Sequence, residues 1–139
     1  MFIDSHCHLD RVELEPYHGQ FDAMLKAAQD REITKMLCVS IELEQFEGMY
    51  ARIENYPFID ASVGVHPLNT NGAVTPVERL IELANKPRIV AIGETGLDYY
   101  YSQDGYDVQQ QSFINHLKAS AITRLPTIIH TRDAREDTL

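Results

Sequence analysis

Short apolar runs recur along this chain, with room for one helix between each pair. Five such runs are rich in Ile and Val and too short for a typical helix, and they cover residues 2–6, 35–41, 58–66, 88–96 and 126–131. Runs of this length and composition are typical of buried β-strands. We therefore predict five strands.

Helical patterns occupy the intervals between these strands. In the first two intervals the apolar residues at helical spacing are Phe21, Met24, Leu25 and Ala28, and then Phe46, Met49, Tyr50 and Ile53. A regular alternation of strand and helix predicts right-handed crossover units on a parallel sheet, with the helices outside it. The expected fold class is α/β.

Two more helices are expected in the second half of the chain. The third begins at Thr75 and Pro76, a capping residue followed by a proline in the first helical position. The fourth spans about residues 105–123. The residues expected on its buried face are Phe113, Leu117 and Ala121.

The composition fits one soluble globular domain over residues 1–139. With 44% hydrophobic and 24% charged residues, the chain is long enough to bury a core of its own. Its formal net charge is −9, from 12 Lys and Arg against 21 Asp and Glu. Bulk electrostatics therefore cannot hold a nucleic acid, and a nucleic-acid substrate would need a local device such as metal ions.

From the sequence we expect neither a membrane span nor a signal peptide. No apolar run approaches the roughly 18 residues that a membrane span requires, and polar residues begin at position 4, which argues against a signal peptide. We expect a cytoplasmic protein with no membrane partner. Its two cysteines, Cys7 and Cys38, are then expected to be reduced thiols.

Two histidines, His6 and His8, stand one residue apart in the stretch FIDSHCHLD, residues 2–10. Side chains at i and i+2 of a strand point the same way, so both imidazoles can face one ion. Taken alone, the pair fits a metal clamp or a polar strand end equally well. Asp4 shares their face and is a candidate to orient one of them.

The ends of later strands favour the clamp. The third predicted strand ends in His66, the fourth in GETGLDYY with Glu94 and Asp98, and the fifth in His130 and Arg132. The carboxyl ends of parallel strands meet at one edge of a sheet, where active-site loops gather. We therefore expect these side chains to converge.

Each of these residues also has a plainer interpretation. Glu94 after an apolar strand fits a helix cap or a solvated turn, and His130 after four uncharged residues fits a core histidine with satisfied hydrogen bonds. His18 and His116 lie in a loop or on the polar side of a helical pattern. We predict that these two are surface histidines.

The order and spacing of the motifs resemble those of the TatD family of metal-dependent hydrolases. FIDSHCHLD matches the opening signature of that family, GVHP and GETGLDYY resemble its next two landmarks, and PTIIHTRDARE resembles a later signature. Thr127 departs from the pattern, because the family usually has an aliphatic residue there. The resemblance extends over all 139 residues and implies an amidohydrolase-like parallel (β/α) barrel of the TIM type.

The resemblance also implies a site with two divalent metal ions. His6 and His8 would bind the first ion, Glu94 would bridge both ions and act as the catalytic residue, and His130 would bind the second. The ions could be Mg, Mn, Zn or Ni.

His66 and Arg132 match family positions near the substrate, where they would contact phosphate oxygens. The implied reaction is hydrolysis of a phosphodiester bond in DNA by a water molecule that the two ions activate. Hydrolysis of an amide or ester is an alternative, because one barrel scaffold supports many chemistries.

The strand count departs from the family. Family members build an eight-stranded barrel from about twice this length, whereas about five units are predicted here, and a later histidine and aspartate of the family have no counterpart. We therefore expect the N-terminal part of a barrel, with open edges that favour self-association. A catalytically incomplete, metal-binding fragment is the remaining alternative.

Overall fold

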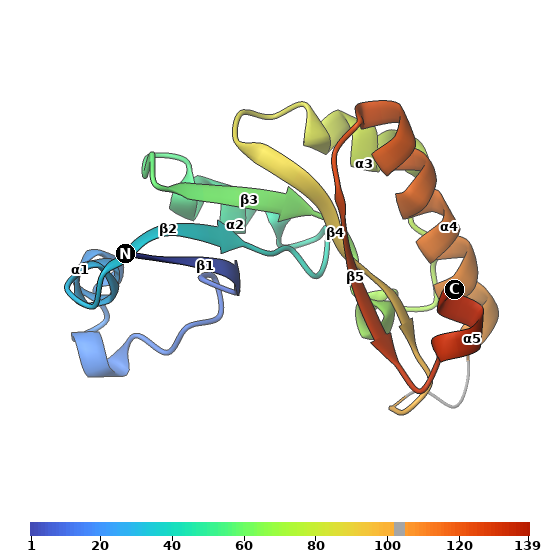
Figure 1. The fold of residues 1–139 in the computed structure, drawn as a ribbon, viewed down its shortest axis with the longest axis horizontal. Helices are drawn as coiled ribbons and strands as arrows, with labels where there is room; N and C mark the ends of the chain where they lie inside the picture. Colours follow the sequence, from blue (N-terminus) through green and yellow to red (C-terminus); the bar gives the residue numbers. More distant parts are fainter. Residues whose placement is uncertain (102–104) are drawn as a thin grey trace.

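The sheet contains five parallel strands in sequence order (Figure 1). The structure is a computed structural model that describes residues 1–101 and 105–139. The strands are β1 (Phe2–Cys7), β2 (Ile33–Cys38), β3 (Ile59–Val63), β4 (Ile89–Asp98) and β5 (Thr127–Arg132). All five predicted strands are confirmed, with boundaries that shift by a few residues. Because every neighbouring pair of strands is parallel, the carboxyl ends of all five strands lie at a single edge of the sheet.

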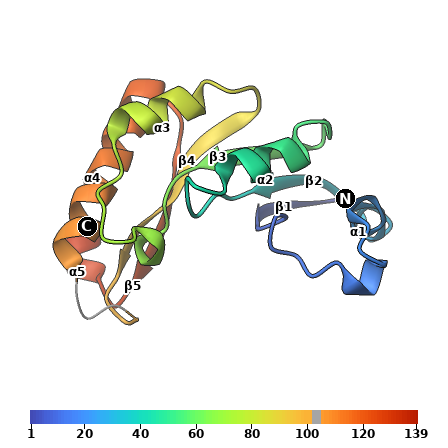
Figure 2. The same ribbon diagram turned by 180° about the vertical axis from the view of Figure 1, so that it is seen from behind.

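Helices connect consecutive strands, one more follows the last strand, and they cover one face of the curled sheet (Figure 2). They are α1 (Phe21–Gln29), α2 (Phe46–Ile53), α3 (Val77–Ala84), α4 (Tyr106–Thr123) and α5 (Arg135–Thr138), with short 3-10 helices η1 (Glu15–Tyr17) and η2 (Pro67–Asn69). Helix α2 packs on β3, and α3 and α4 pack on β4. This arrangement is a curled half-barrel of the kind found in TIM barrels, which confirms the α/β class.

The core lies between the sheet and its helices. Its largest fully buried apolar side chains are Phe46, Ile53, Ile59, Leu80, Leu83, Ile92 and Leu97. The predicted apolar face of α2 is buried as a whole, and so are Met24 and Leu25 of α1. Among the residues that the structure describes, no helix is both long and apolar enough to cross a lipid bilayer.

Helix α4 differs from its prediction because it buries a polar stripe. Leu117 is 41% exposed and Ala121 is also exposed, although Phe113 is buried as expected. Gln109 and Ser112 are buried instead, and both bind other parts of the chain. The predicted face was wrong because hydrogen bonding, and not apolar spacing alone, selects the side of α4 that faces the sheet.

The prediction that His116 lies on the surface is also wrong. Its side chain is fully buried in α4, where the Val65 N–H donates to Nε2 at 3.0 Å and Nδ1 donates to the Ser112 carbonyl at 2.7 Å. Since both ring nitrogens are satisfied, the polar ring can be buried without an orphaned group. His18, by contrast, is exposed as predicted.

Helix α3 starts later than predicted, because Thr75 forms hydrogen bonds with α4. Helix α3 begins after Pro76, and Thr75 does not cap it. Thr75 is buried instead, where its N–H donates to the Ser112 hydroxyl at 2.9 Å and its own hydroxyl accepts from the same group. The residue therefore ties the loop before α3 to α4.

The two cysteines lie opposite each other on neighbouring strands as free thiols. Burial raises the pKa of Cys7 to about 12 and that of Cys38 to about 11. Both thiols therefore stay protonated at neutral pH and act as small apolar groups in the sheet.

Candidate metal centre

The end of β1 presents two imidazole rings side by side. The ring centroids of His6 and His8 lie 5.3 Å apart. His8 Nδ1 lies 2.9 Å from the carbonyl oxygen of Val39, and because a carbonyl only accepts, Nδ1 carries the proton. Nε2 of the neutral ring is then unprotonated, as a metal ligand must be. Asp4 accepts the backbone N–H of His6 at 3.2 Å, so it orients the main chain at His6 and not an imidazole.

The middle of β4 places Glu94 at the centre of the strand ends. Glu94 is only 8% exposed, and its N–H donates to the Ser40 carbonyl at 2.9 Å. Gly93 and Gly96 flank it with φ angles of 139° and 141°. A Cβ at Gly96 would overlap the backbone of His130. Only glycine permits β5 to approach β4 this closely, and that approach brings His130 beside Glu94.

The two carboxylate oxygens of Glu94 face different histidines. Oε2 lies 3.2 Å from Nε2 of His6, and Oε1 lies 3.5 Å from Nδ1 of His130. The carboxylate therefore stands between ligands from opposite edges of the sheet, one from β1 and one from β5. This is the geometry that a bridging carboxylate needs.

Asp98 orients His130 from the carboxyl end of β4. Its Oδ2 lies 2.9 Å from Nε2 of His130, and a carboxylate accepts only, so Nε2 carries the proton and Nδ1 is left unprotonated toward Glu94. Histidines that bind metals commonly donate their second ring N–H to a carboxylate in this way.

Asp98 itself is held ionised in a buried position, being 1% exposed. Burial acts to raise its pKa, but the backbone N–H groups of Tyr101 and Tyr100 and the ring of His130 outweigh burial and lower the pKa below its ordinary value. Gln109 of α4 fixes its main chain, accepting from the Asp98 N–H at 2.8 Å and donating to the Asp98 carbonyl at 3.1 Å.

This orienting role of Asp98 was missed in the sequence. The available signal was an acidic residue at the end of an apolar run, the same pattern that marked Glu94.

His66 lies against His130 but presents a different nitrogen. The centroids of the two rings are 4.3 Å apart. Burial, and next repulsion from His130 when that ring is protonated, lower the pKa of His66 to about 4, so the His66 ring is neutral at pH 7. Its Nδ1 accepts the Leu68 N–H at 3.1 Å, so the proton lies on Nε2. A protonated Nε2 suits donation to an anionic oxygen better than it suits metal binding.

Arg132 is the one predicted site residue outside the two groups of possible metal donors on the described part of the chain. Its guanidinium lies over the rings of Tyr100 and Tyr101, 4.2 and 4.7 Å from their centroids. The structure thus brings five of the six predicted site residues together, and it places Arg132 on two tyrosines beside them.

Two donor sets on the described part of the chain could each hold a metal ion. They are His6, His8 and Glu94, and His66, Glu94 and His130, with possible donor atoms within 4.8 Å of one another in each set. Because His66 is protonated on Nε2, Glu94 and His130 would be the ligands of the second ion. Imidazole nitrogen with carboxylate oxygen suits zinc, manganese, iron and nickel. The tautomers of His8 and His130 and the two-sided Glu94 fit such ions.

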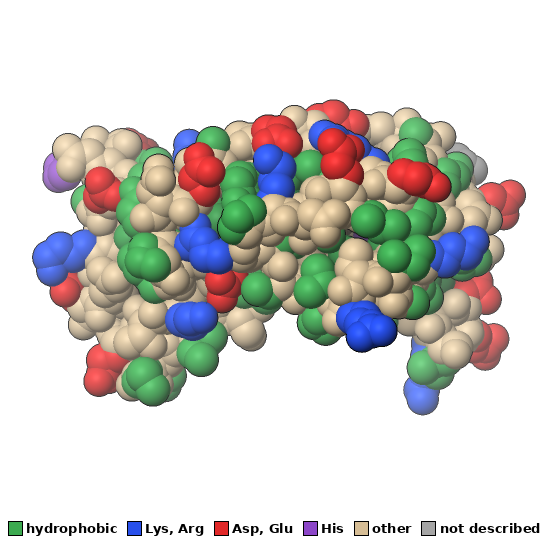
Figure 3. Space-filling model, turned by 90° about the horizontal axis from the view of Figure 1, so that it is seen from above, with side chains coloured by type: hydrophobic (Ala, Val, Ile, Leu, Met, Phe, Trp, Pro, Cys, Tyr) green, Lys and Arg blue, Asp and Glu red, His purple; other side chains and the backbone are tan. Residues whose placement is uncertain are grey.

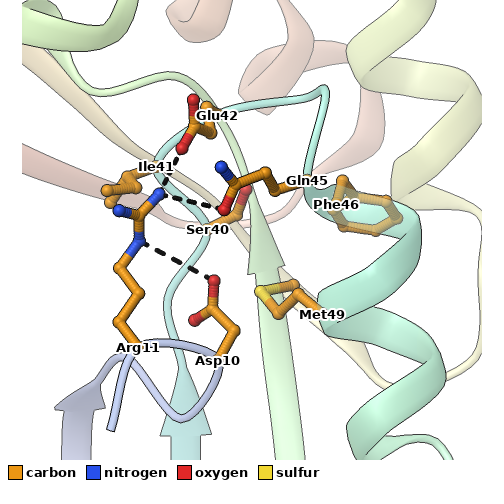
Figure 4. Close-up of a pocket in the computed structure, with 8 residues that line it drawn as sticks. All are labelled: Asp10, Arg11, Ser40, Ile41, Glu42, Gln45, Phe46 and Met49. Carbon is orange, nitrogen blue, oxygen red and sulfur yellow. Dashed lines mark hydrogen bonds and ion pairs between the residues drawn. The ribbon is translucent and has the colours of Figure 1, made fainter. Parts of the chain in front are cut away.

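A second polar cluster fixes the segment that follows His8. Arg11 binds Glu42 and lies 3.3 Å from the side-chain oxygen of Gln45 and 3.8 Å from Asp10 (Figure 4). The hollow beside it has no room even for a water molecule. This cluster is therefore a structural tie between the loops after β1 and β2.

Comparison with known protein sequences finds relatives described as TatD proteins or as metal-dependent hydrolases. The family described as TatD related DNase matches residues 3–139. An uncharacterized metal-dependent hydrolase of Escherichia coli K12, YcfH, is 42% identical over 99% of this chain and 51% of its own length. The 3'-5' ssDNA/RNA exonuclease TatD of Escherichia fergusonii is 30% identical over 75% of this chain and 40% of its own length.

Comparison with solved structures also finds a TatD homologue. The crystal structure of YjjV, a TatD homologue from Escherichia coli K12, superposes with a TM-score of 0.81 at 27% identity, over 99% of this chain and 53% of that one. The chain thus spans about half the length of the curated relatives it matches. With the family match over nearly every residue, the chain belongs to the TatD family of metal-dependent hydrolases.

Proposed function

We propose that this chain carries the metal-binding half of a hydrolase that cleaves phosphodiester bonds in DNA with two divalent ions. One observation carries the proposal. Glu94 directs one oxygen to a histidine of β1 and the other to a histidine of β5, at 3.2 and 3.5 Å. The names of the relatives support both parts, since one is a metal-dependent hydrolase and another a single-strand exonuclease.

Different residues would bind the two ions and the substrate phosphate. His6, His8 and Glu94 would hold one ion, and Glu94 and His130 the other. When bound, such ions lower the pKa of water and polarise a phosphoryl oxygen. His66 offers an Nε2–H to a phosphate oxygen, and Arg132, two residues after His130 in β5, offers a positive charge.

The charge distribution supports a local mode of substrate binding. On the face seen in Figure 3, acidic and basic side chains are interspersed, with hydrophobic ones between them. The chain as a whole is acidic, at −9. Ions at the strand ends, and not a broad basic surface, would attract the phosphates, so activity should depend strongly on added metal.

We also propose that the five β/α units are part of an eight-stranded barrel. The relatives are about twice as long as this chain, and the outer strand β1 leaves Phe2 and Ile3 63% and 65% exposed. Alternatively, a second copy of the chain could cover these exposed side chains of β1, and light scattering of the purified chain tests this. A strict monomer would exclude pairing through the open edges.

Hydrolysis assays test the proposed activity. The purified chain is incubated with manganese or magnesium and with single- and double-stranded oligonucleotides, alongside a panel of amides and esters. We expect metal-dependent cleavage of DNA and no turnover of the panel. Turnover of an amide or ester without DNA cleavage would replace the proposed reaction with the alternative chemistry.

Glu94→Gln is the matched variant for this assay, because it keeps the side-chain size and removes the charge. Loss of cleavage in this variant, with an unchanged circular dichroism spectrum, assigns the activity to the described centre. Metal binding without cleavage of any substrate by the unaltered chain would instead identify a catalytically incomplete, metal-binding fragment.

A further inference from the structure

We propose that Tyr100, Tyr101 and Arg132 form a stacking platform for an unpaired nucleobase beside the metal centre. The inference rests on the proposed function and deepens it, because it names a strand with accessible bases as the substrate. The platform would hold the base next to the phosphodiester bond that is cleaved.

The two rings are exposed and held in a defined arrangement. Tyr100 is 52% exposed and Tyr101 63% exposed, and their centroids lie 4.7 Å apart with the rings nearly perpendicular, at 88°. The guanidinium of Arg132 lies over both rings at 4.2 and 4.7 Å. Two aromatic faces and a planar cation are the groups on which bases stack without regard to sequence.

One carboxylate connects this platform to the metal centre. Oδ1 of Asp98 accepts the backbone N–H groups of both Tyr100 and Tyr101, each at 3.1 Å. Oδ2 of the same side chain holds His130 at 2.9 Å. The turn that carries the tyrosines is therefore positioned by the same carboxylate that orients His130, a candidate metal ligand.

The neighbouring Tyr99 shows what a structural tyrosine looks like in the same segment. Its ring stacks on Tyr106 at 4.0 Å, and its hydroxyl donates to Asp137 at 2.8 Å. Tyr100 and Tyr101 instead present much of their surface to solvent. An acidic chain gains little from general attraction to a nucleic acid, so stacking of about 1–3 kcal/mol per base would be a substantial part of its affinity.

Two fluorescein-labelled strands of equal length test the platform. One is an oligothymidylate and the other an abasic deoxyribose-phosphate strand, and binding is followed by fluorescence anisotropy with calcium present. We expect the chain to bind the thymidylate at least about tenfold more tightly than the abasic strand. The double variant Tyr100→Ala/Tyr101→Ala should lose that preference and bind the abasic strand as before.

Tyr99→Phe is the matched control and should keep the preference. Equal affinity of the unaltered chain for the two strands, including no binding of either, overturns the platform. Hydrolysis of bis(p-nitrophenyl) phosphate, which carries no base, is measured in parallel with manganese. If that hydrolysis persists, the proposed function survives the loss of the platform, and if it is absent as well, both proposals fail.

Discussion

The histidines at the carboxyl edge of the sheet and His116 behind the sheet make different use of the same ring. His8 and His130 each donate one ring N–H to an oxygen of the chain. The other ring nitrogen of each is unprotonated and belongs to a donor set that contains Glu94. His116 has both nitrogens in hydrogen bonds, to Val65 and Ser112. The number of nitrogens that the protein itself uses therefore separates a candidate ligand from a structural histidine.

The comparison also shows that burial is a poor guide to function for a polar ring. His116 is fully buried, whereas the side chain of His6 is 42% exposed and yet lies 3.2 Å from Glu94. Possible metal-donor atoms of several side chains face one another at the edge of the sheet, whereas both ring nitrogens of His116, at the α4 interface, are in hydrogen bonds. Substitutions in the two regions should therefore change different properties.

The largest expected effect is that of Glu94→Gln on metal affinity. The variant removes the only carboxylate shared by both donor sets, so affinity for zinc should fall at least about 100-fold. Competition with a chromogenic chelator measures this. Unchanged zinc affinity in Glu94→Gln would mean that the two donor sets do not form a metal centre.

Asp98→Asn should have a smaller effect of the same kind. An amide can present its NH2 group to His130 and so favour the wrong tautomer, which should weaken metal binding about 10- to 100-fold. The same chelator competition applies. Asn at this position with full affinity would show that His130 needs no orienting carboxylate.

Substitution of His116 should act on stability and its pH dependence and not on metal binding. Burial lowers the pKa of His116 to about 4, against about 6.5 in an unfolded chain. Between these values the unfolded state binds the proton more readily, so the free energy of unfolding falls as pH decreases, by about 2 kcal/mol from pH 7.5 to pH 5. Urea unfolding of His116→Gln should lack this component.

A His116→Gln variant that keeps the full acid sensitivity of the unaltered chain would assign that sensitivity elsewhere, with His66 as the next candidate. The zinc affinity of the variant should match that of the unaltered chain, since His116 belongs to neither donor set.

The smallest effect is expected at His18. This residue is exposed, with a positive φ of 55° that asparagine tolerates well. His18→Asn should change the free energy of unfolding by less than about 0.5 kcal/mol and leave zinc affinity unchanged. A large change in either property would show that exposure and the absence from both donor sets do not identify a neutral histidine.

Strand periodicity made most of this fold predictable. Short Ile- and Val-rich runs identified all five strands, and because parallel strands end at a common edge, the convergence of His6, Glu94 and His130 followed from their places in the sequence. The family resemblance is confirmed by the comparisons. The metal and substrate roles of the individual residues are still predictions.

Contacts between distant elements account for the failures. Nothing local in α4 indicates that His116 meets the Val65 N–H, 51 residues earlier, or that Ser112 binds Thr75. The orienting role of Asp98 likewise depends on a strand pairing that places it opposite Arg132 and beside His130. Apolar spacing describes which side chains avoid water, but it does not describe which polar groups find partners.

The most direct test of the central claim is a zinc titration of the ¹⁵N-labelled chain, followed by long-range ¹H–¹⁵N correlation of its six histidine rings. Zinc should shift the signals of the ring nitrogens at the sheet edge, above all Nε2 of His8 and Nδ1 of His130, while those of His116 and His18 stay in place. Unchanged rings at the edge, or a shift of His116 as large as theirs, would contradict the central claim.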